Sequence, residues 1–115
     1  MLLRVIGEET GETYDFSGIN GDGGDGGGIA AGKEIIAFAD ALLGTDDVAL
    51  DAARVALRAA VGDEGLVDAA GVAATFNGID RIADATGIPL EDAKQELSQD
   101  LRTELNIDAY AAARV

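Results

Sequence analysis

The residues best suited to bind a ligand or assist a reaction in this chain occur in one segment, FNGIDRIADATGIPL, residues 76–90. Asn77 and Arg81 are four positions apart and Asp84 follows three positions later, so a helix would carry all three side chains on one face. A guanidinium is a good partner for a carboxylate or a phosphate. Two interpretations follow: an Arg81–Asp84 ion pair buried between helices, or an arginine that binds a small anionic ligand at a subunit cleft, with Asn77 orienting the ligand.

Two carboxylates earlier in the same predicted helix, Glu64 and Asp68, are candidate acid/base groups near Arg81. A carboxyl group whose pKa is raised by burial can transfer protons near neutral pH. The chain has no histidine, which removes the commonest general base and the commonest metal ligand. It also has no cysteine, so neither thiol peroxidase chemistry nor a thiolate metal site is available. We therefore assign no catalytic residue and expect no metal and no cofactor.

The glycine-rich stretch GGIAAGKE, residues 27–34, has the spacing of a phosphate-binding loop. Such a loop follows a hydrophobic strand and places Ser or Thr after its lysine, whereas here NGDGGDG precedes the stretch and Glu34 follows Lys33. We therefore interpret it as a flexible tether leading into a helix. Asn20, Asp22 and Asp25 offer oxygen donors for calcium, but the alternate donor positions and the closing glutamate of an EF-hand loop are absent.

The overall charge restricts the class of partner. With 22 acidic and 8 basic residues, the 115-residue chain has a formal net charge of −14, and it repels phosphate backbones and anionic lipid surfaces. We therefore expect neither nucleic acid nor a membrane as a partner. The acidic residues are spread along the chain, which indicates a solvating surface or, as the alternative, recognition of a basic partner. With no long apolar run, the expected location is the cytoplasm.

Composition divides the chain into two parts. Residues 1–6, MLLRVI, are compatible with a short strand or a docking arm. Residues 7–28 are rich in Gly and acids and have few apolar anchors, which is typical of a loop or a partly disordered linker. We therefore separate an N-terminal arm with a Gly/Asp-rich loop, residues 1–28, from a helical domain, residues 29–115.

Four helices are predicted in the second part, over residues 29–44, 45–62, 63–85 and 89–106, followed by a short last turn. In the third, residues 69–79 carry no charge. A helix that is apolar on nearly every side needs neighbours on nearly every side. A chain of this size supplies few such neighbours, so the expected fold is an all-α bundle of about four helices that is completed in a homo-oligomer.

The ends of these helices are marked by capping residues. Gly44 is a plausible C-cap, Gly87 and Pro89 stop the third helix, and Gly62 interrupts the pattern between the second and third helices. Thr45 or Asp46 can cap the second helix, because each side chain can accept hydrogen bonds from the free backbone N–H groups of a first turn.

Two segments carry a resemblance to a known family: IIAFADALLG and AARVALRAAVGDEGLVDAAGVAATFNGIDRIADATGIPLED, roughly residues 35–92. They resemble the C-terminal part of the alkylhydroperoxidase D-like and carboxymuconolactone decarboxylase superfamily. The resemblance implies an all-helical fold assembled as a dimer, trimer or hexamer. Four residues match a sequence phrase of this superfamily and are similar to residues of its shared structural framework, not to catalytic ones: Phe76, Asn77, Arg81 and Asp84. The Cys-x-x-Cys pair of the peroxidase branch has no counterpart, because the glycine-rich run takes its place.

Two functions are therefore expected from the sequence. The first is a non-redox helical oligomerising module that binds a small anionic ligand at a subunit interface through Asn77, Arg81 and Asp84. The second is an enzyme related to the carboxymuconolactone decarboxylases or alkylhydroperoxidases, which acts through Glu64 or Asp68 or through a partner subunit. A cavity lined by an acidic side chain, Asn77 and Arg81 would favour the enzyme. An Arg81 that contacts Asp84 and leaves no cavity would favour a structural role.

Overall fold

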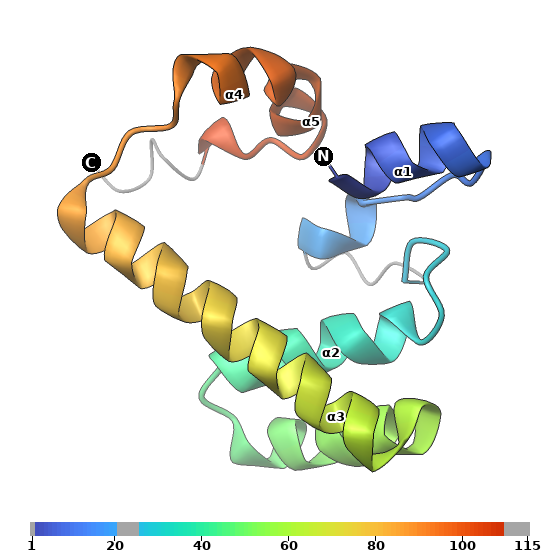
Figure 1. Cartoon of the computed structure of the whole chain (residues 1–115). Coiled ribbons are helices and arrows are strands. Elements are labelled where there is room, and N and C mark those ends of the chain that lie inside the picture. Colours follow the sequence, from blue (N-terminus) through green and yellow to red (C-terminus); the bar gives the residue numbers. More distant parts are fainter. Residues whose placement is uncertain (1, 21–25, 110–115) are drawn as a thin grey trace.

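A computed structural model of the chain describes residues 2–20 and 26–109, and within these ranges it contains helices and no strands (Figure 1). The prediction of an all-α fold is confirmed. The α-helices, in chain order, are α1 (Leu2–Thr10), α2 (Gly32–Leu43), α3 (Asp47–Thr86), α4 (Asp92–Leu97) and α5 (Gln99–Glu104), and a short 3-10 turn, η1 (Ser17–Asn20), follows α1. None of the described helices is long and apolar enough to cross a membrane.

The centre of the fold is a layer formed by α2 and the two arms of α3. Gly62 has φ 78° and ψ −178°, a non-helical conformation that divides α3 into a first arm, residues 47–61, and a second arm, residues 63–86. Figure 1 shows the second arm turning back from this kink and crossing α2. The predicted boundary at Gly62 is therefore real, but the two helices meet there without an intervening loop.

Local chemistry explains where these helices begin and end. The Asp46 carboxylate accepts hydrogen bonds from the backbone N–H groups of Val48 (2.9 Å) and Ala49 (3.1 Å), which otherwise lack partners in a first helical turn. Gly44 ends α2, and Gly87 ends α3 in the left-handed conformation that glycine adopts without strain. The predicted C-cap at Gly44 and the predicted helix end at Gly87 are confirmed, and of the two candidates Thr45 and Asp46 the cap is Asp46.

The N-terminal segment differs from its prediction. Residues 2–10 form α1, so the short strand expected over residues 1–6 is wrong, and so is the loop expected at residues 7–10. An isolated strand has no edge to pair with in a helical fold, whereas a helix satisfies most of its backbone groups internally. The candidate calcium donors Asp22 and Asp25 lie outside the described residues.

The glycine-rich stretch closes on itself before α2. The N–H of Ile29 donates to the carbonyl of Gly26 (3.2 Å), and the N–H of Gly32 donates to the carbonyl of Ile29 (2.9 Å). Gly26 has φ 92° and touches the backbone of Gly32, so a side chain at this position would clash. These N–H groups hold a tight turn at the start of α2, which differs from the open cradle of N–H groups in a phosphate-binding loop.

The single helix predicted over residues 89–106 is wrong in one respect, because Ser98 divides it into α4 and α5. Ser98 has φ −100° and ψ 0°, outside the helical range, and its hydroxyl donates to the carbonyl of Lys94 (2.6 Å). The break lets Arg102 donate back to the carbonyl of Gln95 (3.2 Å) and buries Leu105. These tertiary contacts outweigh the continuous helical pattern of the sequence. Figure 1 shows α4 and α5 away from the layer of α2 and α3.

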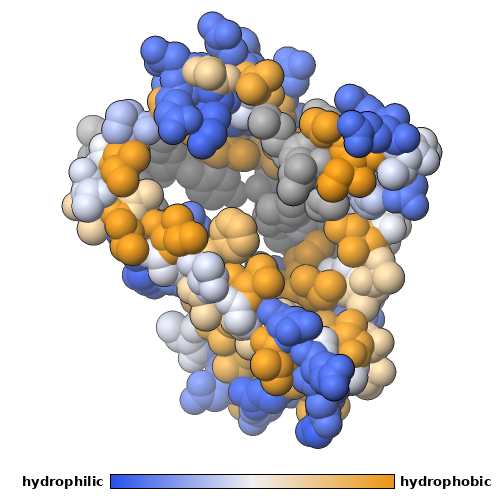
Figure 2. All heavy atoms as spheres, viewed as in Figure 1, coloured by the Kyte–Doolittle hydropathy of each residue, from blue (hydrophilic) through white to orange (hydrophobic). Residues whose placement is uncertain are grey.

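The described part of the chain has a small apolar core. Its buried large apolar side chains are Phe16, Phe38, Leu57 and Leu105, and of these Leu57 alone is fully buried. The radius of gyration is 15.5 Å, against about 13 Å for a compact domain of this length. Figure 2 shows apolar residues at the surface over much of the molecule, including the part formed by α3. The described part of the chain therefore leaves many large apolar side chains in water.

Candidate functional site

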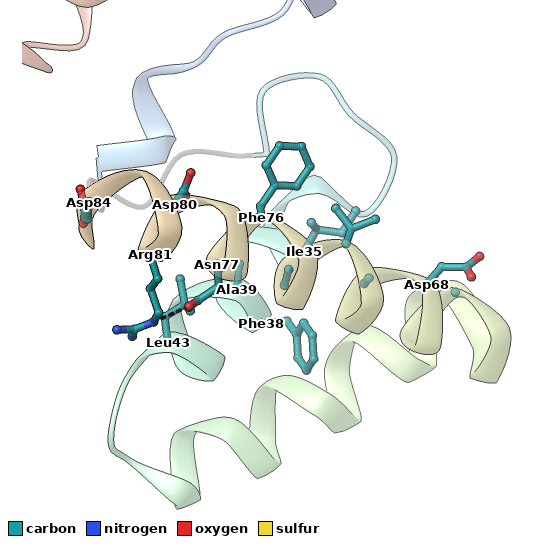
Figure 3. Close-up of a pocket in the computed structure, with 14 residues that line it drawn as sticks. Ile35, Phe38, Ala39, Leu43, Asp68, Phe76, Asn77, Asp80, Arg81 and Asp84 are labelled. Atoms are coloured by element: carbon teal, nitrogen blue, oxygen red, sulfur yellow. Dashed lines mark hydrogen bonds between the residues drawn. The ribbon is translucent and has the colours of Figure 1, made fainter. Parts of the chain in front are cut away.

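A groove of about 790 Å³ runs between α2 and the second arm of α3 (Figure 3). From α2 it is lined by Ile35, Phe38, Ala39 and Leu43, and from α3 by one face of residues 65–84. The wall is mainly apolar because α2 and the uncharged segment of α3, residues 69–79, face each other here. We refer to this feature below as the groove.

The predicted cluster of Asn77, Arg81 and Asp84 lies on the groove. Nε of Arg81 donates a hydrogen bond of 2.7 Å to Oδ1 of Asn77, one helical turn away, and the dashed line in Figure 3 marks this bond. Arg81 and Asp84 are both exposed, so neither lies in the buried setting that the ion-pair interpretation assumed.

The two candidate acid/base residues are not brought together with this cluster. Asp68 lines the groove, but it lies 13 positions before Arg81, which corresponds to about 20 Å along a helix axis. Figure 3 accordingly shows Asp68 and Arg81 at opposite ends of the groove. Glu64 lines a separate depression with Asp63, Val67 and Asp68. Glu64 and Asp68 are both exposed.

The charges around the groove are mostly negative. Asp68, Asp80 and Asp84 contribute three carboxylates to the lining, and Arg81 contributes one guanidinium. Asp80 was not singled out from the sequence, although its position directly before Arg81 was a signal that could have been used. In the described ranges, no group of three acidic side chains is close enough to hold a metal ion.

The apolar part of the groove is unusually accessible for a helical layer. Val72 is 59% exposed, and Phe76 and Leu43 are each 62% exposed. By contrast, Phe38, which lines the same groove from α2, is only 5% exposed. The groove therefore has a buried aromatic ring, Phe38, at its base. The side chains of Leu43, Val72 and Phe76 form an edge that is exposed to solvent. The sequence did not indicate the contribution of Leu43, because its position depends on how α2 crosses α3.

Comparison with known proteins does not identify a family or a function for this chain. No family model matches the chain, and no curated protein or solved structure is detectably similar to it. The resemblance of residues 35–92 to the alkylhydroperoxidase D-like superfamily therefore stands on the quoted residues and remains an expectation.

Proposed function

We propose that this chain is a non-redox helical module whose main activity is to assemble with further copies of itself. The observation that carries the proposal is the accessible surface of 8509 Å², against about 5,900 Å² for a compact monomer of the same mass. The exposed apolar side chains that contribute to this surface include Leu43, Val72 and Phe76 at the open edge of the groove.

The resemblance to the alkylhydroperoxidase D-like superfamily supports the same proposal, because it implies helical subunits that associate into dimers, trimers or hexamers. A four-helix bundle is not complete within one protomer, since α4 and α5 stand apart from the layer of α2 and α3 (Figure 1). In this proposal the bundle is completed when a neighbouring subunit covers that layer, as expected for subunits whose folding and association are coupled.

A small anionic ligand has weaker support as the occupant of the groove. Arg81 and Asn77 could hold a carboxylate or a phosphate group. The three carboxylates of Asp68, Asp80 and Asp84 line the same groove, however, and repel a free anion. Self-assembly is therefore the better supported of the two candidate functions, and binding of a small anion is the weaker one.

The enzyme alternative is favoured by one observation, the convergence of Asn77, Arg81 and Asp84 on a groove with an apolar wall. Against it, Glu64 lies outside the groove and Asp68 lies at its far end. The candidate acid/base groups and the arginine therefore do not surround one reacting atom, which proximity catalysis requires.

Sedimentation velocity of the purified chain over a wide range of concentrations tests the proposal. We expect the weight-average mass to rise above that of the 11.7 kDa protomer as concentration increases. A chain that remains a monomer at every concentration, while its circular dichroism shows the helical fold, would refute the proposal.

A further inference from the structure

The groove has the features of one half of a protein interface. Its floor is packed by Phe38, while Leu43, Val72 and Phe76 leave more than half of their surface in water. Figure 3 shows Phe76 projecting on the same side of the second arm of α3 as Ile35. Exposed aromatic and aliphatic side chains beside a concave apolar surface are typical of a contact whose partner is missing.

We propose that a second copy of this chain fills the groove, with Phe76 of each protomer entering the groove of the other. The inference depends on the proposed function, that the chain assembles with itself, and it adds which face is used and which residue anchors the contact. A twofold axis makes such a contact self-complementary, because the same surface is used by both partners.

The area of exposed surface is sufficient for this occupant. Each protomer exposes 8509 Å², which exceeds the surface of a compact chain of its mass by about 2,600 Å². A stable interface of ordinary size removes about 800 Å² from each partner. This excess is spread over the whole molecule, and it is about three times the area that each partner loses in such an interface.

The charge pattern allows two copies to meet at this place. Residues 69–79 carry no charge, and the nearest carboxylates on the groove face, Asp68 and Asp80, flank this segment at its two ends. A contact centred on the uncharged segment leaves these carboxylates at the rim, where water still solvates them. Burying them without partners would instead oppose association strongly.

The net charge predicts how salt affects this contact. Each copy carries −14, so two copies repel each other as they approach, and added salt weakens that repulsion. We expect the dimer dissociation constant to fall by roughly tenfold to a hundredfold between 0.1 M and 1 M salt, as the Debye length shortens from about 10 Å to about 3 Å. A basic helix bound in the same groove would show the opposite sign, because salt would screen an attraction.

The deciding experiment compares two variants by sedimentation equilibrium at both salt concentrations. Phe76→Asp places a charge in the proposed contact, and Val55→Asp places the same charge at an equally exposed position on the first arm of α3, outside the groove. Because both side chains are exposed in the protomer, both variants should keep the helical circular dichroism of the original chain.

We expect Phe76→Asp to raise the dissociation constant by about a hundredfold or more, since one substitution removes two central aromatic anchors from a twofold contact. Val55→Asp should change it little.

The outcomes separate this inference from the proposed function. Loss of the dimer in Phe76→Asp alone, together with tighter association in high salt, supports the inference. If both variants associate as the original chain does, assembly uses another face, so the inference is wrong while the proposed function stands. If the original chain is monomeric throughout, both are wrong. If high salt dissociates the dimer, the two copies meet through an attraction between charges and not through the uncharged segment, so the inference is wrong.

Discussion

The backbone at Gly62 offers the sharpest test of how the groove is built. With φ 78° and ψ −178°, Gly62 occupies a region that is accessible almost only to glycine. Apart from its chain neighbours and the helix backbone within four residues, no atom lies within 4 Å of the position that a Cβ would take, so Gly62→Ala meets no steric clash with the rest of the fold. The cost of the substitution is therefore backbone strain alone, about 1–3 kcal/mol of the free energy of unfolding.

Gly71→Ala is the matched control. Gly71 lies in the second arm of α3, its φ is not positive, and a Cβ added there also meets open space. Alanine is favoured over glycine in a helix interior by about 1 kcal/mol. We therefore expect Gly71→Ala to raise the free energy of unfolding by about that amount, while the same substitution at Gly62 lowers it. The difference in sign distinguishes the two backbone conformations directly.

Urea denaturation followed by circular dichroism measures both effects, and small-angle X-ray scattering reports the shape. If alanine at position 62 relieves its strain by joining the two arms, α3 becomes one rod of 40 residues, about 60 Å long. That exceeds the longest dimension of the fold, 41 Å, so the radius of gyration would rise from 15.5 Å. The reasoning is refuted if Gly62→Ala is as stable as the original chain and has the same radius of gyration.

Three further predictions concern single side chains. Asp46→Ala should lower the free energy of unfolding by about 1 kcal/mol through loss of the helix cap, whereas Thr45→Ala, which removes no capping bond, should change it little in the same urea titration. Leu57→Ala should lower it by about 3 kcal/mol, because this fully buried side chain would leave a cavity, and a loss below 1 kcal/mol would contradict the assigned core. The hydrogen bond from Tyr14 to Glu12 raises the pKa of the Tyr14 phenol above 10.0, since it favours the protonated form. The ultraviolet absorbance titration of Tyr14 should therefore shift to lower pH in Glu12→Gln.

The features that sequence reasoning identified correctly are local ones. The helix ends at Gly44 and Gly87, and Asp46 as one of two candidate N-caps, were recognised because a cap satisfies backbone groups within its own turn, which requires no knowledge of distant contacts. The boundary at Gly62 was recognised for a similar reason, since glycine is weak in a helix interior. The sequence did not show that the chain would turn sharply there without a loop, because that depends on α2 packing against both arms of α3.

The features that it missed depend on partners far along the chain. The segment of residues 89–106 has a continuous helical pattern, yet the contact of Arg102 with the carbonyl of Gln95 accompanies a break at Ser98. Arg81 was expected to be covered because apolar residues surround it in the sequence. Its exposure, although it lines the groove beside α2, shows that apolar neighbours in the sequence do not by themselves bury a side chain.

The sequence by itself determined that the chain is helical, that it is strongly acidic, and that one segment of the third predicted helix carries no charge. These properties follow from side-chain composition, spacing and capping, which act within a few residues. The tertiary structure alone decided that α2 and the second arm of α3 enclose a groove, that Asp68 and Arg81 lie at its opposite ends, and that Phe76 is left in water. These arrangements depend on the direction in which the chain turns at Gly62, and a backbone turn redirects every residue that follows it.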